Sequence, residues 1–308
     1  MGKTAFVFSG QGAQYPGMGK ELYDASPAAR SIFEISERIR PGTMKLCFLG
    51  TKEELTRTIN TQPCLYTVDL AAAAALEEMG IAADAAAGFS LGEVAALTFA
   101  GRMSPEEGFA FVMERGQRME DAAQKNPGTM AAVMRLSPPQ TLQIASECGV
   151  YAANYNSPQQ TVFSGEKEAV RMFCGRIKEA GGMALPLSVG GAFHSPLMKG
   201  AAAALAEVLR NTVYRSGAKC PVYANKTASP YPEDPEEAKK LMASQVESPV
   251  LWQQTIENMA ADGFDTFIEV GAGSTLTGLI RKTVPHVTAF SVEKAADLKK
   301  EELRYVKK

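Results

Sequence analysis

The stretch GFSLG at residues 88–92 decides the fold, because it places Ser90 between two glycines where one local pattern gives way to another. The apolar run AAA at 85–87 leads into it and predicts a buried strand, and EVAAL at 93–97 leads out of it with the pattern of a helix. Flanking glycines let the strand and the helix pack closely around a strained turn. We therefore expect a nucleophile elbow, with the Ser90 hydroxyl at the carboxyl edge of a sheet and helix amides near enough to stabilise an oxyanion.

A catalytic serine needs a base, and the chain has only two histidines, His194 and His286. His194 lies in the glycine-rich stretch VGGAFHSP (189–196), where a loop can carry it over the floor of a cleft. His286 precedes a late strand and completes, with Ser90 and Asp265, the chain order of an α/β-hydrolase triad. A tight turn in which Ser90 only caps the helix is the alternative without catalysis. The residues by themselves leave these alternatives open.

The composition is ordinary for a globular enzyme, with 45% hydrophobic and 21% charged residues in a chain of 308. Lysine and arginine are scattered and the net charge is -2, so we expect no nucleic-acid partner. The most apolar long stretch, residues 68–76, is too short to cross a bilayer. The first strand is predicted from residue 4, so we expect no signal peptide before it. Five cysteines without a C-x-x-C pair indicate reduced thiols in the cytoplasm, neither a disulfide framework nor a zinc site.

Strand and helix patterns alternate over the first part of the chain, which predicts a mainly parallel sheet covered by helices on both faces. The strand at 4–8 is followed by a helix that starts near Thr61 with Pro63 in its first turn. The capping box SPEE at 104–107 starts a helix that runs to about Lys125.

From residue 128 the rhythm becomes β-α-β-β-α-β, which is the element order of a ferredoxin-like unit. We therefore expect an α/β fold with a core formed by residues 1–126 and 190–308, an inserted subdomain at 127–189, and a ligand cleft between the two. The tail at 294–308 is rich in lysine and glutamate and predicts a solvated terminal helix.

The loop SGQGAQ at 9–14 follows the first strand and should lie beside the elbow at the same edge of the sheet. Its glycines let backbone amides approach a ligand. A phosphate cradle is one reading, but the third glycine of a dinucleotide fingerprint is missing. A second oxyanion donor is the better interpretation.

Seven motifs follow one another along the chain. They are FSGQGAQ (8–14), GFSLGE (88–93), ERG (114–116), NYNSP (154–158), GAFHSP (191–196), QVESPVLW (245–252) and IEVGAG (268–273). In this order they resemble the motifs of the malonyl-CoA:acyl carrier protein transacylases. The resemblance covers about residues 4–292 and is far more specific than the elbow alone.

The resemblance implies an α/β-hydrolase-like core with an inserted ferredoxin-like subdomain, and an enzyme that moves a malonyl group from malonyl-CoA to the phosphopantetheine thiol of acyl carrier protein. It makes Ser90 the nucleophile and His194 its base, so that the order of Asp265 and His286 becomes coincidence. No aspartate completes a triad in this family. No metal and no cofactor is implied, because the pantetheine is carried by the partner, and we expect a monomer.

Further site residues are implied by the same resemblance. The backbone amides of Gln11 and Leu91 become the oxyanion donors, and Gln245 orients His194 through its main-chain carbonyl. Arg115 becomes the clamp on the malonyl carboxylate. Phe193, typical of malonyl-selective forms, and Asn156 complete the substrate-binding residues.

Chemistry supports the role of Arg115 independently, since a planar guanidinium grips a carboxylate through two parallel hydrogen bonds and a lysine cannot. Gly116 beside it costs helix stability, which makes sense only if something packs close. The alternative is a surface arginine, because arginine is mostly exposed. We expect Arg118, one turn further along the helix, to be a surface arginine of this kind.

Three departures from the family pattern stand out. Phe89 replaces the histidine often found before the nucleophile, and Gly190 and Ala272 replace residues that are commonly serine or proline. We expect altered packing and loop stiffness with intact chemistry. Three other functions stay open: an acyltransferase serving a polyketide assembly line with another extender or carrier, a serine hydrolase or thioesterase using Asp265 and His286, and an inactive carrier-binding module.

Overall fold

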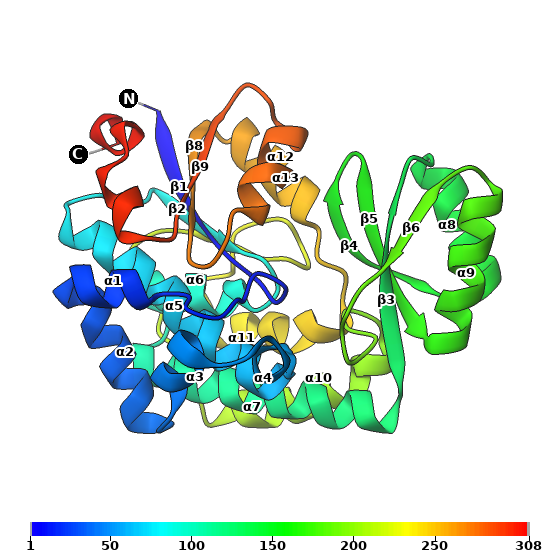
Figure 1. The fold of residues 1–308 in the computed structure, drawn as a ribbon, viewed down its shortest axis with the longest axis horizontal. Helices are drawn as coiled ribbons and strands as arrows, with labels where there is room; N and C mark the ends of the chain where they lie inside the picture. Colours follow the sequence, from blue (N-terminus) through cyan, green and yellow to red (C-terminus); the bar gives the residue numbers. More distant parts are fainter. Residues whose placement is uncertain (1, 307–308) are drawn as a thin grey trace.

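The computed structural model describes residues 2–306, and two separate β-sheets frame the molecule (Figure 1). The strands of the larger sheet are β1 (Lys3–Phe8), β2 (Ala85–Gly88), β7 (Val222–Tyr223), β8 (Phe264–Val270) and β9 (Thr288–Val292). They lie in the order β7-β2-β1-β8-β9, and each neighbouring pair is parallel. The mainly parallel sheet predicted from the alternating pattern is therefore confirmed.

Helices pack on both faces of this sheet. Those that precede the second sheet are α1 (Lys20–Ala25), α2 (Pro27–Ile39), α3 (Thr43–Leu49), α4 (Lys52–Thr56), α5 (Thr58–Glu78), α6 (Gly92–Phe99) and α7 (Pro105–Lys125). Those that follow it are η1 (Pro196–Met198), α10 (Lys199–Arg210), α11 (Pro235–Ser244), η2 (Gln245–Glu247), α12 (Trp252–Ala261), α13 (Thr275–Thr283), η3 (Ala295–Lys299) and η4 (Glu301–Tyr305).

The smaller sheet is antiparallel and forms a lobe of its own, drawn in green in Figure 1. Its elements are β3 (Gly128–Met134), α8 (Pro138–Cys148), β4 (Tyr151–Ser157), β5 (Gln160–Glu166), α9 (Lys167–Glu179) and β6 (Met183–Pro186). The strand order β4-β5-β3-β6 and the element order agree with the expected ferredoxin-like unit. The α/β fold class is confirmed, while the limits at residues 127 and 189 remain predictions.

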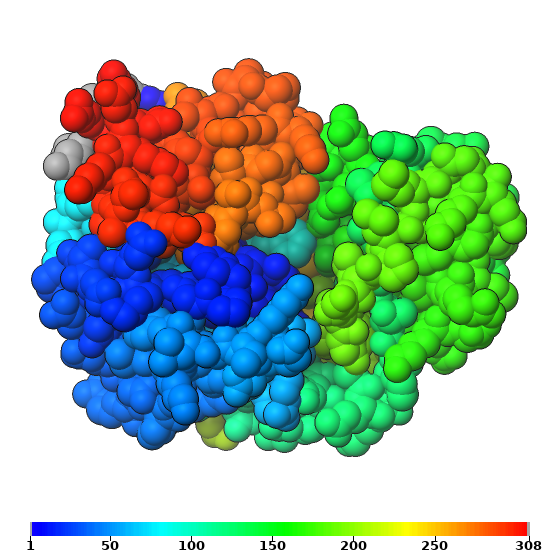
Figure 2. Space-filling model, in the orientation of Figure 1, coloured from blue at the N-terminus to red at the C-terminus, as the bar shows by residue number. Residues whose placement is uncertain are grey.

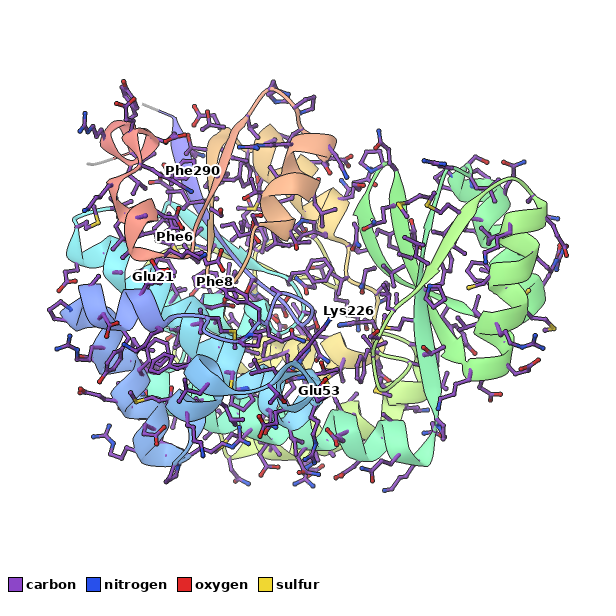
Figure 3. All side chains as sticks on the ribbon, in the orientation of Figure 1. Phe6, Phe8, Glu21, Glu53, Lys226 and Phe290 are labelled. Carbon is purple, nitrogen blue, oxygen red and sulfur yellow. The ribbon has the colours of Figure 1, made fainter. Side chains whose placement is uncertain are left out.

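The central strand β1 explains how the larger sheet is covered on both sides. Phe6 and Phe8 point into the main core, where each lies within 5.5 Å of the Phe99 ring of α6 (Figure 3). Ala5 and Val7 point to the other face and belong to a second cluster with residues of α12 and α13. An apolar run buried on both faces is typical of a parallel strand.

Close packing at the carboxyl ends of β1 and β2 brings the elbow and the loop after β1 together. A Cβ on Gly92 would stand 2.3 Å from the carbonyl oxygen of Phe8, and one on Gly88 would stand 2.0 Å from that of Gly92. A Cβ on Gly10 would stand 2.4 Å from the carbonyl oxygen of Phe89. Only glycine fits at these three positions, so the elbow motif and the loop at 9–14 meet as expected.

Two local expectations were wrong. Helix α5 begins at Thr58, so Pro63 lies inside the helix instead of in its first turn. The tail forms the two short 3₁₀ helices η3 and η4 instead of one solvated helix, because Leu303 and Val306 are buried against the core. Residues 307 and 308 of the predicted tail lie outside the described residues. None of the helices within residues 2–306 is long and apolar enough to span a membrane.

Candidate active site

Ser90 lies between β2 and α6 with a left-handed backbone, at φ 54°. This conformation is unfavourable for any residue with a Cβ and is the mark of a strained elbow. The Ser90 hydroxyl lies 2.7 Å from Nε2 of His194. The structure therefore pairs the predicted serine with one of the two histidines.

Two main-chain carbonyls outside its own loop hold the His194 ring in one tautomer. Its Nδ1 lies 3.1 Å from two carbonyl oxygens, those of Gln245 and Ser248. Carbonyls only accept hydrogen bonds, so Nδ1 carries the proton and Nε2 is left as the acceptor for the Ser90 hydroxyl. Burial, together with the nearby charge of Arg115, lowers the pKa of His194 to about 4, and the imidazole is neutral at pH 7.

The alternative triad of Ser90, Asp265 and His286 is wrong. Asp265 and His286 are both exposed, Asp265 near the start of β8 and His286 just before β9. Since the strands are parallel, both lie at the amino edge of the sheet, opposite the edge that carries Ser90. No carboxylate is needed to orient His194, because two main-chain carbonyls do so.

Arg115 reaches the nucleophile from α7 and is only 2% exposed. One of its terminal nitrogens, Nη2, donates to the Ser90 hydroxyl (3.1 Å) and to Oε1 of Gln245 (2.8 Å). The other, Nη1, is buried without a partner among residues 2–306. Burial lowers the pKa of Arg115 to about 10, which leaves it charged at neutral pH. Arg118 instead pairs with Glu114 at the surface, as expected.

Gln245 contacts the site through its side chain as well as its main chain. Its Nε2 donates to the main-chain oxygen of Ser90 (2.8 Å) while its Oε1 accepts from Arg115. The resemblance implied a contact of its main-chain carbonyl with His194 and gave no indication of these side-chain bonds. Gln245 begins the 3₁₀ helix η2 and is buried.

Within residues 2–306, the amides of Gln11 and Leu91 have no acceptor, whereas the Ser90 amide has one. The Ser90 amide donates to Oδ1 of Asn225 (2.7 Å). Neither Gln11 nor Leu91 donates its amide to an acceptor in the described part of the chain. Leu91 is buried, where a main-chain amide without a partner is rare. Both amides are suited to a developing oxyanion.

A small chamber of about 70 Å³ contains the catalytic pair. Its lining combines Ser90 and His194 with the residues Gln11, Phe89, Met119, Met130, Asn154, Leu187, Val189 and Phe193. The chamber adjoins a cleft of about 310 Å³ that runs between the loop at 9–13, α13 and the smaller sheet. The hollow between the two lobes is visible in Figure 2.

The predicted substrate residues divide between these two spaces. Phe193 lines the chamber beside His194. Asn156 lines only the outer cleft, where its Nδ2 donates to Oε1 of Gln160 and its Oδ1 is buried without a partner within residues 2–306. Phe89 packs edge-on against Trp252, 5.5 Å between ring centres, and occupies the wall between chamber and cleft.

Sequence reasoning missed several residues of the site. Asn154 lines both spaces, Glu93 and Asn225 lie buried under the elbow, and two methionines close the chamber. Asn225 lies two residues after the end of β7, and a polar residue soon after a strand of a parallel sheet was the available signal. No group of three or more His, Cys, Asp or Glu side chains that could hold a metal ion occurs in residues 2–306.

Comparison with known proteins agrees with this arrangement. The acyl transferase domain family matches residues 5–307. The malonyl CoA-acyl carrier protein transacylase of Bacillus subtilis (strain 168) is 39% identical over 299 residues, which are 95% of this chain and 94% of that protein.

Solved structures show the same likeness. That of the transacylase of the same name from Clostridium perfringens has a TM-score of 0.93 at 37% identity, covering 98% of both chains. A malonyl-transacylase in complex with a type II PKS acyl-carrier protein has a TM-score of 0.92 at 33% identity, covering 96% of this chain and 97% of that one. This chain therefore belongs to the acyl transferase domain family and, within it, to the malonyl-CoA:acyl carrier protein transacylases.

Proposed function

We propose that the protein transfers a malonyl group from malonyl-CoA to the phosphopantetheine thiol of acyl carrier protein through an acyl-enzyme on Ser90. The observation that carries the proposal is the contact of the Ser90 hydroxyl with a neutral His194 imidazole (2.7 Å) beside a buried, incompletely paired Arg115. Ser90 and His194 supply a nucleophile and its base. The arginine supplies a partner for an acyl group that carries a carboxylate.

In the first half-reaction, Nε2 of His194 takes the proton of the Ser90 hydroxyl while Oγ attacks the thioester carbonyl. The amides of Gln11 and Leu91 stabilise the oxyanion, which is the role their free state suits. The tetrahedral intermediate breaks its C–S bond, and the CoA thiolate leaves with the proton from His194. The malonyl group is then esterified to Ser90.

In the second half-reaction the carrier's thiol gives its proton to Nε2 of His194 and attacks the ester. The C–O bond to Ser90 breaks, and the serine recovers its proton from His194. The proton taken from Ser90 leaves on CoA, and the proton of the carrier's thiol replaces it on Ser90, so the transfer balances without a cofactor. The apolar side chains of Met119, Met130 and Phe193 around the chamber limit the access of water, which would otherwise hydrolyse the ester.

Arg115 binds the malonyl carboxylate in this proposal. Its Nη1 has no partner among the residues that the structure describes, and the bond from Nη2 to the Ser90 hydroxyl is exchanged for the carboxylate when the acyl group arrives. The side chain of Gln245 keeps the guanidinium in place by accepting from Nη2. Two nitrogens of one planar group can then bind two carboxylate oxygens.

The outer cleft suits the pantetheine arm that both substrates share. Its wall is mostly apolar, with Val162, Leu187 and Leu276 among its side chains. The unpartnered Oδ1 atoms of Asn154 and Asn156 are acceptors for the amide N–H groups of the arm. We expect a monomer in the cytoplasm, where a reducing environment matches the five unbridged cysteines.

Mass spectrometry of the intact protein mixed with malonyl-CoA tests the proposal. A malonyl adduct that persists, is absent from Ser90→Ala, and disappears when holo acyl carrier protein is added supports transfer. Rapid release of free malonate without carrier would establish a hydrolase, and the absence of any adduct would leave a carrier-binding module. An adduct that only a polyketide carrier removes would assign the same chemistry to the polyketide alternative.

A further inference from the structure

One buried side chain joins the two sides of the elbow. Oδ1 of Asn225 accepts from the Ser90 amide (2.7 Å), and its Nδ2 donates to the carbonyl of Gly88 (2.6 Å). Asn225 is 0% exposed, so water does not compete for either bond. We propose that Asn225 is a positioning residue for acyl transfer, which holds Ser90 so that its hydroxyl stays in line with Nε2 of His194. This inference rests on the proposed function.

The elbow needs such a support because its backbone is strained. Ser90 has φ 54°, in the left-handed region that residues with a Cβ avoid. A residue keeps such a conformation only where its surroundings fix it. The carboxamide of Asn225 fixes it from both sides, at the nucleophile's own amide and at the last residue of β2.

The same contact decides which amides face the oxyanion. The Ser90 N–H is occupied by Asn225, whereas the next amide, that of Leu91, has no acceptor within residues 2–306. If the bond to Asn225 broke, the Ser90 amide would be a buried donor without a partner and would turn toward another acceptor. Asn225 thus fixes the orientation of both the Ser90 hydroxyl and the Leu91 amide that would bind the oxyanion.

Asn225 is itself fixed by its main chain. Its amide donates to Oε2 of Glu93 (2.5 Å), and its carbonyl accepts from the amide of Leu251 (2.8 Å). Glu93 belongs to α6, which begins two residues after Ser90, and its Oε1 accepts from the hydroxyl of Tyr231. The support therefore connects β2, α6 and the segment after β7, and a distortion at Asn225 is passed directly to Ser90.

The pair of bonds requires a group with one donor and one acceptor of this size, which among short side chains is the carboxamide. Asn225→Ala leaves the Ser90 amide and the Gly88 carbonyl without partners. Asn225→Asp keeps the acceptor for Ser90, but when ionised it places a second acceptor against Gly88. Asn258→Ala is a matched control, because Nδ2 of Asn258 donates to the carbonyl of Ala228 in the same segment (2.8 Å) without touching the elbow.

Single-turnover acylation by malonyl-CoA, followed by intact mass, is the first measurement. We expect Asn225→Ala to acylate about a hundredfold more slowly, the effect of a displacement near 1 Å at the reacting atom. The affinity for malonyl-CoA, measured by calorimetry, should differ by no more than about twofold between Ser90→Ala and the double variant Ser90→Ala/Asn225→Ala, since the substitution of Asn225 displaces only the nucleophile. Asn258→Ala should acylate at the wild-type rate. Unchanged acylation in folded Asn225→Ala, or an equal loss in Asn258→Ala, would overturn the proposal.

Asn225→Asp decides the matter if the alanine variant does not fold. Its acylation rate relative to wild type should rise as the pH falls from about 8 to about 5.5, because a protonated carboxyl again donates to Gly88. Wild type and Asn225→Asp share the titratable and charged groups around position 225, which are Glu93, Tyr231, Arg115 and His194. The ratio of their acylation rates therefore reports the titration of the substituted side chain. A ratio that does not change with pH would contradict positioning by the carboxamide. If wild type fails to acylate with malonyl-CoA, the proposed function fails instead, and a fluorophosphonate that reacts with Ser90 replaces malonyl-CoA in the same comparison.

Discussion

Replacing Arg115 by alanine should remove the preference for a malonyl group. Arg115 is 2% exposed, and the acyl group that reaches Ser90 enters a chamber of about 70 Å³ with little room for water. A carboxylate that enters this space loses its hydration and is stabilised only by the guanidinium. Without Arg115 it is a buried charge without a partner.

The size of the loss follows from that geometry. Truncating one partner of a buried, hydrogen-bonded charge pair costs about 2–5 kcal/mol. Nη1 has no partner within residues 2–306, and Nη2 can leave the Ser90 hydroxyl, so the substitution removes two hydrogen bonds to the carboxylate together. We expect about 3 kcal/mol, or about a hundredfold in kcat/KM for malonyl-CoA. Acetyl-CoA brings no carboxylate, so its transfer should stay the same or improve once the unpaired arginine is gone.

The assay compares kcat/KM for malonyl-CoA and acetyl-CoA in each variant, with holo acyl carrier protein as the acceptor. Arg115→Ala should lower the malonyl-to-acetyl ratio about a hundredfold, and Arg115→Lys should restore little of it, because an ammonium cannot bind both oxygens in the plane. Arg118→Ala is the matched control, since Arg118 lies on the same helix but pairs with Glu114. A ratio that is the same in wild type and Arg115→Ala would refute the reading of Arg115 as the carboxylate's partner.

Three further outcomes can be checked. His194→Ala should slow acylation by about two to four powers of ten while His286→Ala, exposed at the opposite edge of the sheet, acylates normally in the same intact-mass assay; the reverse would revive the hydrolase triad. The acylation rate of Gln245→Ala should lie between those of wild type and His194→Ala, because the main-chain carbonyl still contacts His194 while the side-chain bonds to Arg115 and Ser90 are lost. A wild-type acylation rate would show that the Gln245 side chain is dispensable. Burial raises the pKa of Glu93 to about 7 in the folded protein, so its protonated form stabilises the fold fully below pH 4.5, and this stabilisation is lost as the pH rises through 7. Glu93→Gln does not titrate, so its melting temperature minus that of wild type should increase between pH 6 and pH 8. A difference that stays constant with pH would contradict this.

The parts of the fold that the sequence predicted are those with strong local constraints. The elbow depends on glycines where a Cβ would clash with a backbone oxygen at 2.0 to 2.3 Å, and such constraints leave a motif in the sequence. The capping box at Ser104 and Glu107 is present as expected for the same reason. The start of α5 was not predictable, because Pro63 is accommodated inside a helix that is buried along almost its whole length.

Contacts between distant residues were the part that the sequence did not reveal. The main-chain role of Gln245 followed from family resemblance, but its side chain meets Arg115 across 130 positions of the chain. Asn225 meets Ser90 across 135 positions. A single asparagine after a two-residue strand has no local pattern that separates a structural role from a turn residue. Only the tertiary structure shows what the side chains of Gln245 and Asn225 contact.

Arg115 links substrate selection to the strength of the base. Burial is the main reason why the pKa of His194 is about 4, and the charge of Arg115 lowers it further, which makes the imidazole a weak base. A malonyl carboxylate bound to Arg115 would offset that charge, so we expect the pKa of His194 to rise by the part due to Arg115 while the effect of burial remains. An acyl group without a carboxylate leaves the charge in place and the base weak. Selectivity should therefore appear in kcat as well as in KM, and removal of Arg115 should strengthen His194 toward neutral acyl groups at the same time as it removes the partner of the carboxylate.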